Sequence, residues 1–197
     1  MKKFEPINNE DGMKTLCRMI HGIEFEDLPS DVIDFAKKHI LDTMGVTIAG
    51  SAEEGIKEVV EFVKEQGGKE ESIIPFYGGK KVPASMAAFA IGPMARAIDL
   101  GDCHEYAGHT SEYTLPTLIA ATGLKKRVSG KEFITAFVVG QEVLIRIGIA
   151  IKAMSEGLAA GMHGGHFVFG PVAAVAKLLG MSLEEMQNAE GIIRGMT

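Results

Sequence analysis

Residues 129–153, SGKEFITAFVVGQEVLIRIGIAIKA, contain the longest helical pattern of the sequence and decide the fold. A helix is predicted over about 131–153, after the serine and glycine that open the stretch. Because this helix is apolar on nearly all sides, we expect it at the centre of a helical domain. Glu142 and Arg146 lie four residues apart in it, and we interpret them as a structural ion pair that keeps both charges inside.

Shorter helical patterns with apolar residues three and four positions apart occur on both sides of this stretch. The predicted helices cover about 13–22, 30 to between 45 and 50, 53–66, 83–98, 115–123, 170–179 and from 183 onward. Gly92-Pro93 is expected to kink or break the helix in which it lies. One short β-hairpin is predicted near 72–82, with a turn at 77–80. The sequence therefore predicts an all-α, multi-helix bundle with one short β-hairpin.

The composition disfavours several classes of function. Hydrophobic residues make up 46% and charged residues 23% of the 197 residues, and the net charge is −6. An acidic chain is not typical of a nucleic-acid-binding protein. The two cysteines, Cys17 and Cys103, are too few for a disulfide framework. No uncharged apolar run approaches 18 residues and the first residues lack a signal-peptide core, so we expect a cytoplasmic protein without a membrane span.

A polar segment at 99–109, DLGDCHEYAGH, interrupts the apolar sequence. It carries Asp99, Asp102 and His109 between two stretches that are predicted to be buried helices. Carboxylates held beside histidines away from water have shifted proton affinities, which general acid–base catalysis requires. The alternative interpretation is a solvated loop that caps the neighbouring helices, and composition alone does not separate the two.

The histidines of this segment do not have the spacing of a metal site. His104 and His109 lie five residues apart, whereas two zinc ligands on one face of a helix lie four apart. Gly108 also weakens helix at this point. We therefore predict no metal.

A second candidate site is the glycine-rich segment at 161–166, GMHGGH, which precedes a predicted helix. Glycines allow the backbone to approach a ligand closely, and a helix N-terminus attracts anions. His163 or His166 could therefore meet a carboxylate substrate. A flexible loop with incidental histidines remains the alternative.

Several motifs follow one another in order from about residue 25 to the C-terminus. They are Leu28-Pro29, Leu41-Asp42-Thr43-Met44-Gly45, Ala49-Gly50, Asp99-Leu100-Gly101-Asp102, His109, Pro116, Gly140-x-Glu142-Val143-x-x-Arg146, Gly161-Met162-His163 and Ala176-Lys177-Leu178-Leu179-Gly180-Met181. Their order and spacing resemble those of the MmgE/PrpD family, which includes 2-methylcitrate dehydratase, cis-aconitate decarboxylase and iminodisuccinate epimerase. The resemblance implies a helical domain of that family's type, without a metal or organic cofactor.

The resemblance also implies roles for particular residues. Asp99, His109 and His163 fall on the family's acid–base and substrate-contact positions, and Asp102 is a helper in the same segment. Cys103 stands where the family often has threonine. These positions make Asp102, Cys103 and His166 the candidate substrate-binding residues.

Two departures from the family pattern bear on the site. His109 is followed by Thr110, whereas the family has His-Pro. The segment between His163 and Gly170 is one residue longer than usual, so either His163 or His166 could take the family histidine's role.

Family members are much longer than this chain, and their second half supplies further helices, a small α+β domain and more site residues. We therefore expect 1–24 to be an extension with a first weak helix and 25–197 to be a partial helical domain. One expected function is a lyase or isomerase domain that uses acid–base chemistry on a small di- or tricarboxylic acid, inactive or partner-dependent as this short chain. The alternative is a non-catalytic helical subunit or relic that only oligomerises. The expected partner is a second copy or a complementary second-half chain.

Overall fold

The computed structural model describes residues 11–154 and 164–195, and within them the chain forms eight α-helices and three short 3-10 turns. The helices are α1 Gly12–His21, α2 Ser30–Gly50, α3 Ile56–Gln66, α4 Ala84–Arg96, α5 Thr110–Ala121, α6 Gly130–Met154, α7 Phe169–Leu179 and α8 Leu183–Arg194. The 3-10 turns are Phe25–Asp27, Thr122–Leu124 and Gly164–Val168. The expected all-α class is confirmed.

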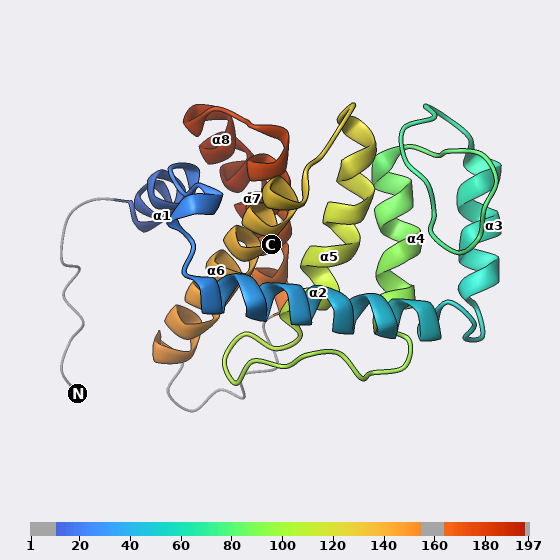
Figure 1. The fold of residues 1–197 in the computed structure, drawn as a ribbon, viewed down its shortest axis with the longest axis horizontal. Helices are drawn as coiled ribbons and strands as arrows, with labels where there is room; N and C mark the ends of the chain where they lie inside the picture. The colour runs from blue at the N-terminus through green and yellow to red at the C-terminus, as the bar shows by residue number, and fades with distance from the viewer. Residues whose placement is uncertain (1–10, 155–163, 196–197) are drawn as a thin grey trace.

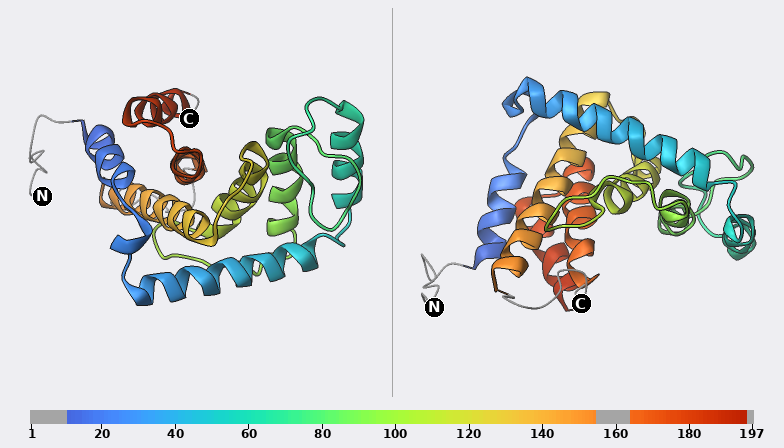
Figure 2. Two further views of the ribbon diagram at one scale, coloured as in Figure 1. Left: turned by 45° about the horizontal axis from the view of Figure 1, so that its top comes forward. Right: turned by 90° about the horizontal axis from the view of Figure 1, so that it is seen from below.

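The helices α3, α4, α5 and α6 stand roughly side by side, and α2 crosses one end of this row (Figure 1). The long α2 helix contacts α4, α5 and α6 in turn. Helices α1 and α8 pack together at the other side of α7, and the two views in Figure 2 show that the row is curved. The loop between α4 and α5 runs along the same end as α2, which places its polar residues near that helix (Figure 1).

Three apolar clusters hold these elements together. The first joins α3 and α4 through Val60 and Ile91, and the second joins α1, α6, α7 and α8 around Val143. The third joins α2, α5, α6 and α7 around Phe137 and Leu118. Each of these side chains is at most 1% exposed, so burial of the apolar helix faces is the main source of stability.

Helix α6 confirms the predicted long central helix and packs most extensively on α7. The crossing is close because both helices carry a glycine there: a Cβ on Gly170 would lie 2.7 Å from the carbonyl oxygen of Gly140. By length and hydropathy α6 is also the one described helix that could cross a membrane, with 44% of its most apolar window buried. A core helix of this kind meets the same criterion, and α6 packs as one.

The Glu142–Arg146 pair is present, but the expectation that it lies inside is wrong. Arg146 Nε donates to Glu142 Oε1 at 2.6 Å, and the two side chains are 54% and 37% exposed. Ile149, one turn further along α6, is also 46% exposed. This part of α6 therefore faces outward, since the neighbouring helices cover its opposite side.

The predicted β-hairpin near 72–82 is wrong. Ser72 and Val82 form a single antiparallel bridge, with N–O distances of 2.9 and 2.8 Å, and no strand is assigned within the described ranges. Pro75 has no N–H to donate to a ladder, and Phe76 adopts a positive φ of 69°. The segment instead forms a loop that buries Ile74 against α3 and α4.

Two predicted helix boundaries also differ from the structure. Pro93 lies inside α4, which continues past it to Arg96, so the predicted break is absent; Ile91 and Met94, both fully buried, anchor the helix in the core on either side of it. Helix α5 begins at Thr110, five residues before the predicted start near 115. The polar loop is therefore shorter than expected and ends at His109, the residue that precedes α5.

Candidate active site

Asp99 and His109 meet because the loop between α4 and α5 folds back on itself. Asp99 lies three residues after Arg96, the last residue of α4, and adopts a positive φ of 52°, an uncommon conformation for a residue with a side chain. His109 occupies the N-cap position of α5. The His109 Nε2–Asp99 Oδ1 distance is 3.8 Å. The segment thus brings a carboxylate beside a histidine, but the Asp99 side chain is 68% exposed and is not held away from water; the catalytic roles of both residues remain a prediction.

Arg96, in the last turn of α4, anchors the Asp99 carboxylate. Its guanidinium forms an ion pair with Asp99, and its Nε also lies 3.5 Å from Glu112 Oε2. The hydrogen bond from Arg96 is the main cause that lowers the pKa of Asp99 below its ordinary value. Asp99 is therefore ionised at neutral pH and can accept a hydrogen bond from His109 without taking its proton.

Glu112, in the first turn of α5, is a member of this cluster that the sequence analysis missed. Its Oε1 lies 3.6 Å from His109 Nδ1, and its side chain is only 1% exposed. The backbone of Gly101 packs against it, since a Cβ there would lie 2.7 Å from the Glu112 carboxyl carbon. Burial raises the pKa of Glu112 above its ordinary value, although His109 and Arg96 oppose the shift. The sequence signal that could have identified Glu112 is an acidic residue three positions after His109 in an otherwise apolar segment.

Asp102 belongs to a second polar cluster next to the first. It accepts hydrogen bonds from Thr110 Oγ1 at 3.0 Å and from the N and Oγ of Ser111 at 3.2 and 2.9 Å. Asp102 thus satisfies backbone and side-chain donors in the first turn of α5. His39 Nδ1, from α2, lies 3.3 Å from Asp102 Oδ2, and Gln141 of α6 donates to Ser111 Oγ at 3.3 Å. The sequence analysis missed His39 and Gln141, because only the tertiary fold brings α2 and α6 to this loop.

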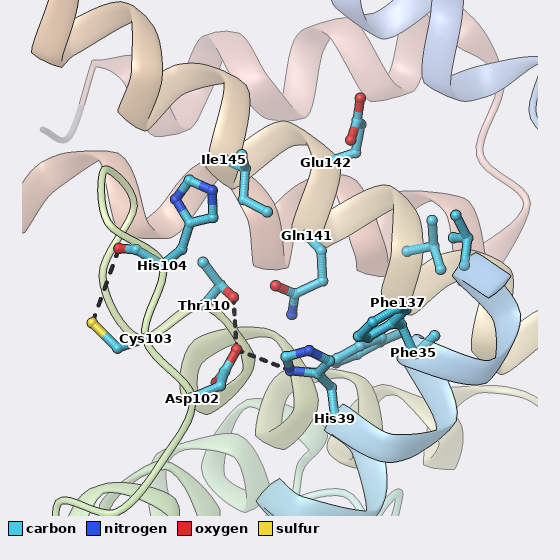
Figure 3. Close-up of a pocket in the computed structure, with 13 residues that line it drawn as sticks. Phe35, His39, Asp102, Cys103, His104, Thr110, Phe137, Gln141, Glu142 and Ile145 are labelled. Carbon is cyan, nitrogen blue, oxygen red and sulfur yellow. Dashed lines mark hydrogen bonds and ion pairs between the residues drawn. The ribbon is translucent and has the colours of Figure 1, made fainter.

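A cavity of about 280 Å³ opens beside the second cluster (Figure 3). Phe35, Phe137 and Ile145 supply apolar walls, while Asp102 and His104 line its polar side. In Figure 3 Gln141 points toward the pair formed by His39 and Asp102. A pocket with apolar walls and a few converging polar groups is typical of a small-molecule site.

The other predicted site residues have different surroundings. Cys103 is exposed, lines the cavity and approaches the His104 carbonyl with its Sγ at 3.9 Å. His163 lies outside the described residues. His166 is 6% exposed, in the 3-10 turn before α7, and its ring centroid lies 4.1 Å from that of Phe167.

The turn before α7 contacts the region of the first polar cluster. Phe167 stacks on Tyr113 with ring centroids 4.5 Å apart, and a Cβ on Gly108 would lie 3.2 Å from the Phe167 ring. Burial raises the pKa of Tyr113 above its ordinary value. Phe167, which directly follows the glycine-rich segment, therefore packs against Gly108 and Tyr113, which lie before and after His109 in the sequence.

The fold and the site together define an all-α domain with an acid–base cluster at the start of one helix. The MmgE/PrpD N-terminal domain model matches residues 14–194, and the chain belongs to this family. Cis-aconitate decarboxylase-like protein oryM of Aspergillus oryzae is 31% identical over 190 residues, which cover 90% of this chain and 38% of that protein. Cis-aconitate decarboxylase of Aspergillus terreus is 32% identical over 199 residues, covering 97% and 40%.

The mouse cis-aconitate decarboxylase is 29% identical over 184 residues, which cover 91% of this chain and 38% of that enzyme. The chain therefore spans about two fifths of the length of the curated relatives it matches. The family match begins inside α1, within the segment that the sequence analysis had treated as an extension.

Proposed function

We propose that this chain supplies the acid–base part of a lyase or isomerase site that acts on a small di- or tricarboxylic acid. The observation that carries the proposal is the cluster in which His109 lies 3.8 Å from the ionised Asp99, itself anchored by Arg96. An imidazole oriented by a carboxylate is a common arrangement for moving a proton at neutral pH. The names of the relatives, all cis-aconitate decarboxylases or similar to them, favour a tricarboxylic acid.

In this proposal His109 exchanges a proton with a carbon next to a substrate carboxylate, and Asp99 stabilises the imidazolium that forms. His163 or His166 contacts a substrate carboxylate, while Asp102 and Cys103 contribute polar contacts from the neighbouring cavity. Turnover depends on residues that the relatives carry outside the matched two fifths. We expect catalysis to require those residues, supplied either by a complementary chain or by the same polypeptide.

The test is turnover of cis-aconitate by the chain alone and after co-expression with the second half of a relative. We expect activity only with the second half, and a loss of at least about 100-fold in His109→Gln and Asp99→Asn, which is the usual size of a general acid–base contribution. Glu184→Gln, an exposed change in α8, is the control. Unchanged turnover in His109→Gln would contradict the proposal.

A second candidate function is association without catalysis, and one observation favours it. Helix α2 exposes Phe35, Leu41 and Ile48 at 60%, 75% and 52%. Monomeric proteins seldom leave large apolar patches uncovered. We propose that a second copy or a complementary chain covers this helix. Sedimentation of the purified chain at micromolar concentration should show a species larger than the 21.1 kDa monomer, and Leu41→Lys should shift it toward the monomer.

A further inference from the structure

We infer that Glu112 is a positioning residue for His109, and that it sets which imidazole nitrogen carries the proton. The inference rests on the proposed function, because it gives the His109 ring a defined protonation pattern within that site. The ring lies between two carboxylates, with Asp99 3.8 Å from Nε2 and Glu112 3.6 Å from Nδ1.

The Glu112 side of the ring is closed. His109 Nδ1 and both Glu112 carboxylate oxygens are buried, and none has a hydrogen-bond partner among the residues that the structure describes. Burying a carboxylate without a hydrogen bond is costly, and a shift of a few tenths of an ångström would bring Nδ1 and Oε1 into hydrogen-bond range. Gly101 closes the remaining space, so the side chain has little room to turn elsewhere.

The chemistry of imidazole explains why the contact with Glu112 determines the tautomer of His109. A neutral imidazole has one N–H and one lone pair, and the partner of one nitrogen determines which of them faces the other partner. An ionised Glu112 accepts from Nδ1–H, which leaves the Nε2 lone pair free on the Asp99 side. A protonated Glu112 donates to Nδ1, which moves the ring proton to Nε2, where Asp99 accepts it. The two states present a base or an acid at the same position.

The charges around Glu112 decide which state is present. Groups on three elements act on it: Arg96 of α4, Asp99 and Asp102 of the loop, and His109 of the α5 N-terminus. Burial is the largest influence and raises the pKa of Glu112, while His109 and Arg96 lower it. The ring should therefore change from one tautomer to the other at a pH above the ordinary pKa range of a glutamate.

The experiment reads the ring directly, without activity. The full chain is labelled with ¹⁵N-histidine, and the His109 signals are assigned by their loss in His109→Gln. At pH 8 the wild-type ring should hold its proton on Nδ1. In Glu112→Met, a substitution of similar size without an acceptor, the proton should move to Nε2 because Asp99 is then the only carboxylate facing the ring.

Two further variants complete the test. Glu112→Gln cannot titrate and can accept from or donate to Nδ1, so the neutral ring should hold one tautomer that no longer changes with pH; a tautomer change that persists in this variant would overturn the inference. Glu190→Gln removes another buried carboxylate on α8 and should leave the His109 signals unchanged. An unchanged His109 tautomer in Glu112→Met overturns the inference. That result would leave the proposed function standing if His109→Gln still abolished turnover, so the two failures can be told apart.

Discussion

Two carboxylates lie buried among the residues that the structure describes, and they differ in what surrounds them. Glu112 of α5 is 4% exposed and Glu190 of α8 is 1% exposed, and neither has a hydrogen-bond partner among the described residues. Burial raises the pKa of both, for Glu190 to about 8. Around Glu112, however, Arg96 and His109 oppose this shift, whereas burial is the only cause at Glu190.

This difference shows when a buried acidic side chain indicates a functional site. At Glu190 only burial raises the pKa, and its charge in turn adds to the raised pKa of the Cys17 thiol, about 11, for which burial is the largest cause. Glu112 faces an imidazole and a guanidinium, so its ionisation is coupled to other groups. Coupling to a cation, and not burial by itself, marks the candidate site.

The largest expected effect is on stability at Glu190. Its pKa in the folded state is about 8, against 4.5 for an ordinary glutamate, so folding penalises its ionised form. The free energy of unfolding is unaffected below pH 4.5, falls as the pH rises toward 8, and then levels off. Each pKa unit corresponds to about 1.4 kcal/mol, so the full penalty is about 5 kcal/mol.

Glu190→Gln should therefore raise the free energy of unfolding at pH 8 by up to about 5 kcal/mol relative to the wild type, and by little at pH 4.5. Urea denaturation at several pH values measures this difference. Glu184→Gln, at an exposed position of the same helix, controls for the change of one charge. An equal effect of the two substitutions at pH 8 would show that the Glu190 environment is not apolar.

An intermediate loss of stability is expected when the surroundings of Glu112 are made more like those of Glu190. Arg96→Met leaves Glu112 with less compensation, so its surroundings become more like those of Glu190. We expect the free energy of unfolding at pH 8 to fall by about 1 to 2 kcal/mol, less than for a fully buried pair because the Arg96 side chain is 45% exposed and solvent screens its charge. Arg96→Lys should cost less, because it keeps the charge.

The measurement is again urea denaturation, with ¹³C NMR of the Glu112 carboxyl as a second reading. The pKa of Glu112 should rise further in Arg96→Met, since the guanidinium no longer favours the ionised form. A loss of stability without any change in this titration would mean that Arg96 acts only through Asp99.

The helices could be predicted from the sequence because apolar periodicity and burial agree along most of the chain. The exceptions have local causes: Pro93 is tolerated because Met94 and Ile91 anchor α4, and Pro75 prevents the hairpin ladder. Asp99 and His109 were identified as candidate site residues from the family resemblance together with their shared polar segment.

The rest of the site depends on contacts between elements that are far apart in the sequence. Arg96 at the end of α4 meets Glu112 at the start of α5, and His39 of α2 reaches Asp102 across the cavity. No spacing along the chain encodes these contacts, since they follow from how α2 crosses the row of helices (Figure 1). Glu112 was visible only as an unexplained charge in an apolar helix.

The smallest effect on stability is expected from Glu112→Gln, the same substitution that is expected to matter most at Glu190. Removing the charge relieves the burial penalty, which favours the variant as the pH rises above the ordinary glutamate value. It also removes the attraction to Arg96 and an acceptor for the His109 ring N–H, which favours the wild type. Because the two contributions have opposite signs, the free energy of unfolding at pH 8 should change by less than about 1 kcal/mol. Denaturation of both Gln variants in parallel makes the comparison, and a gain at Glu112 as large as that at Glu190 would show that Arg96 and His109 do not stabilise its ionised form.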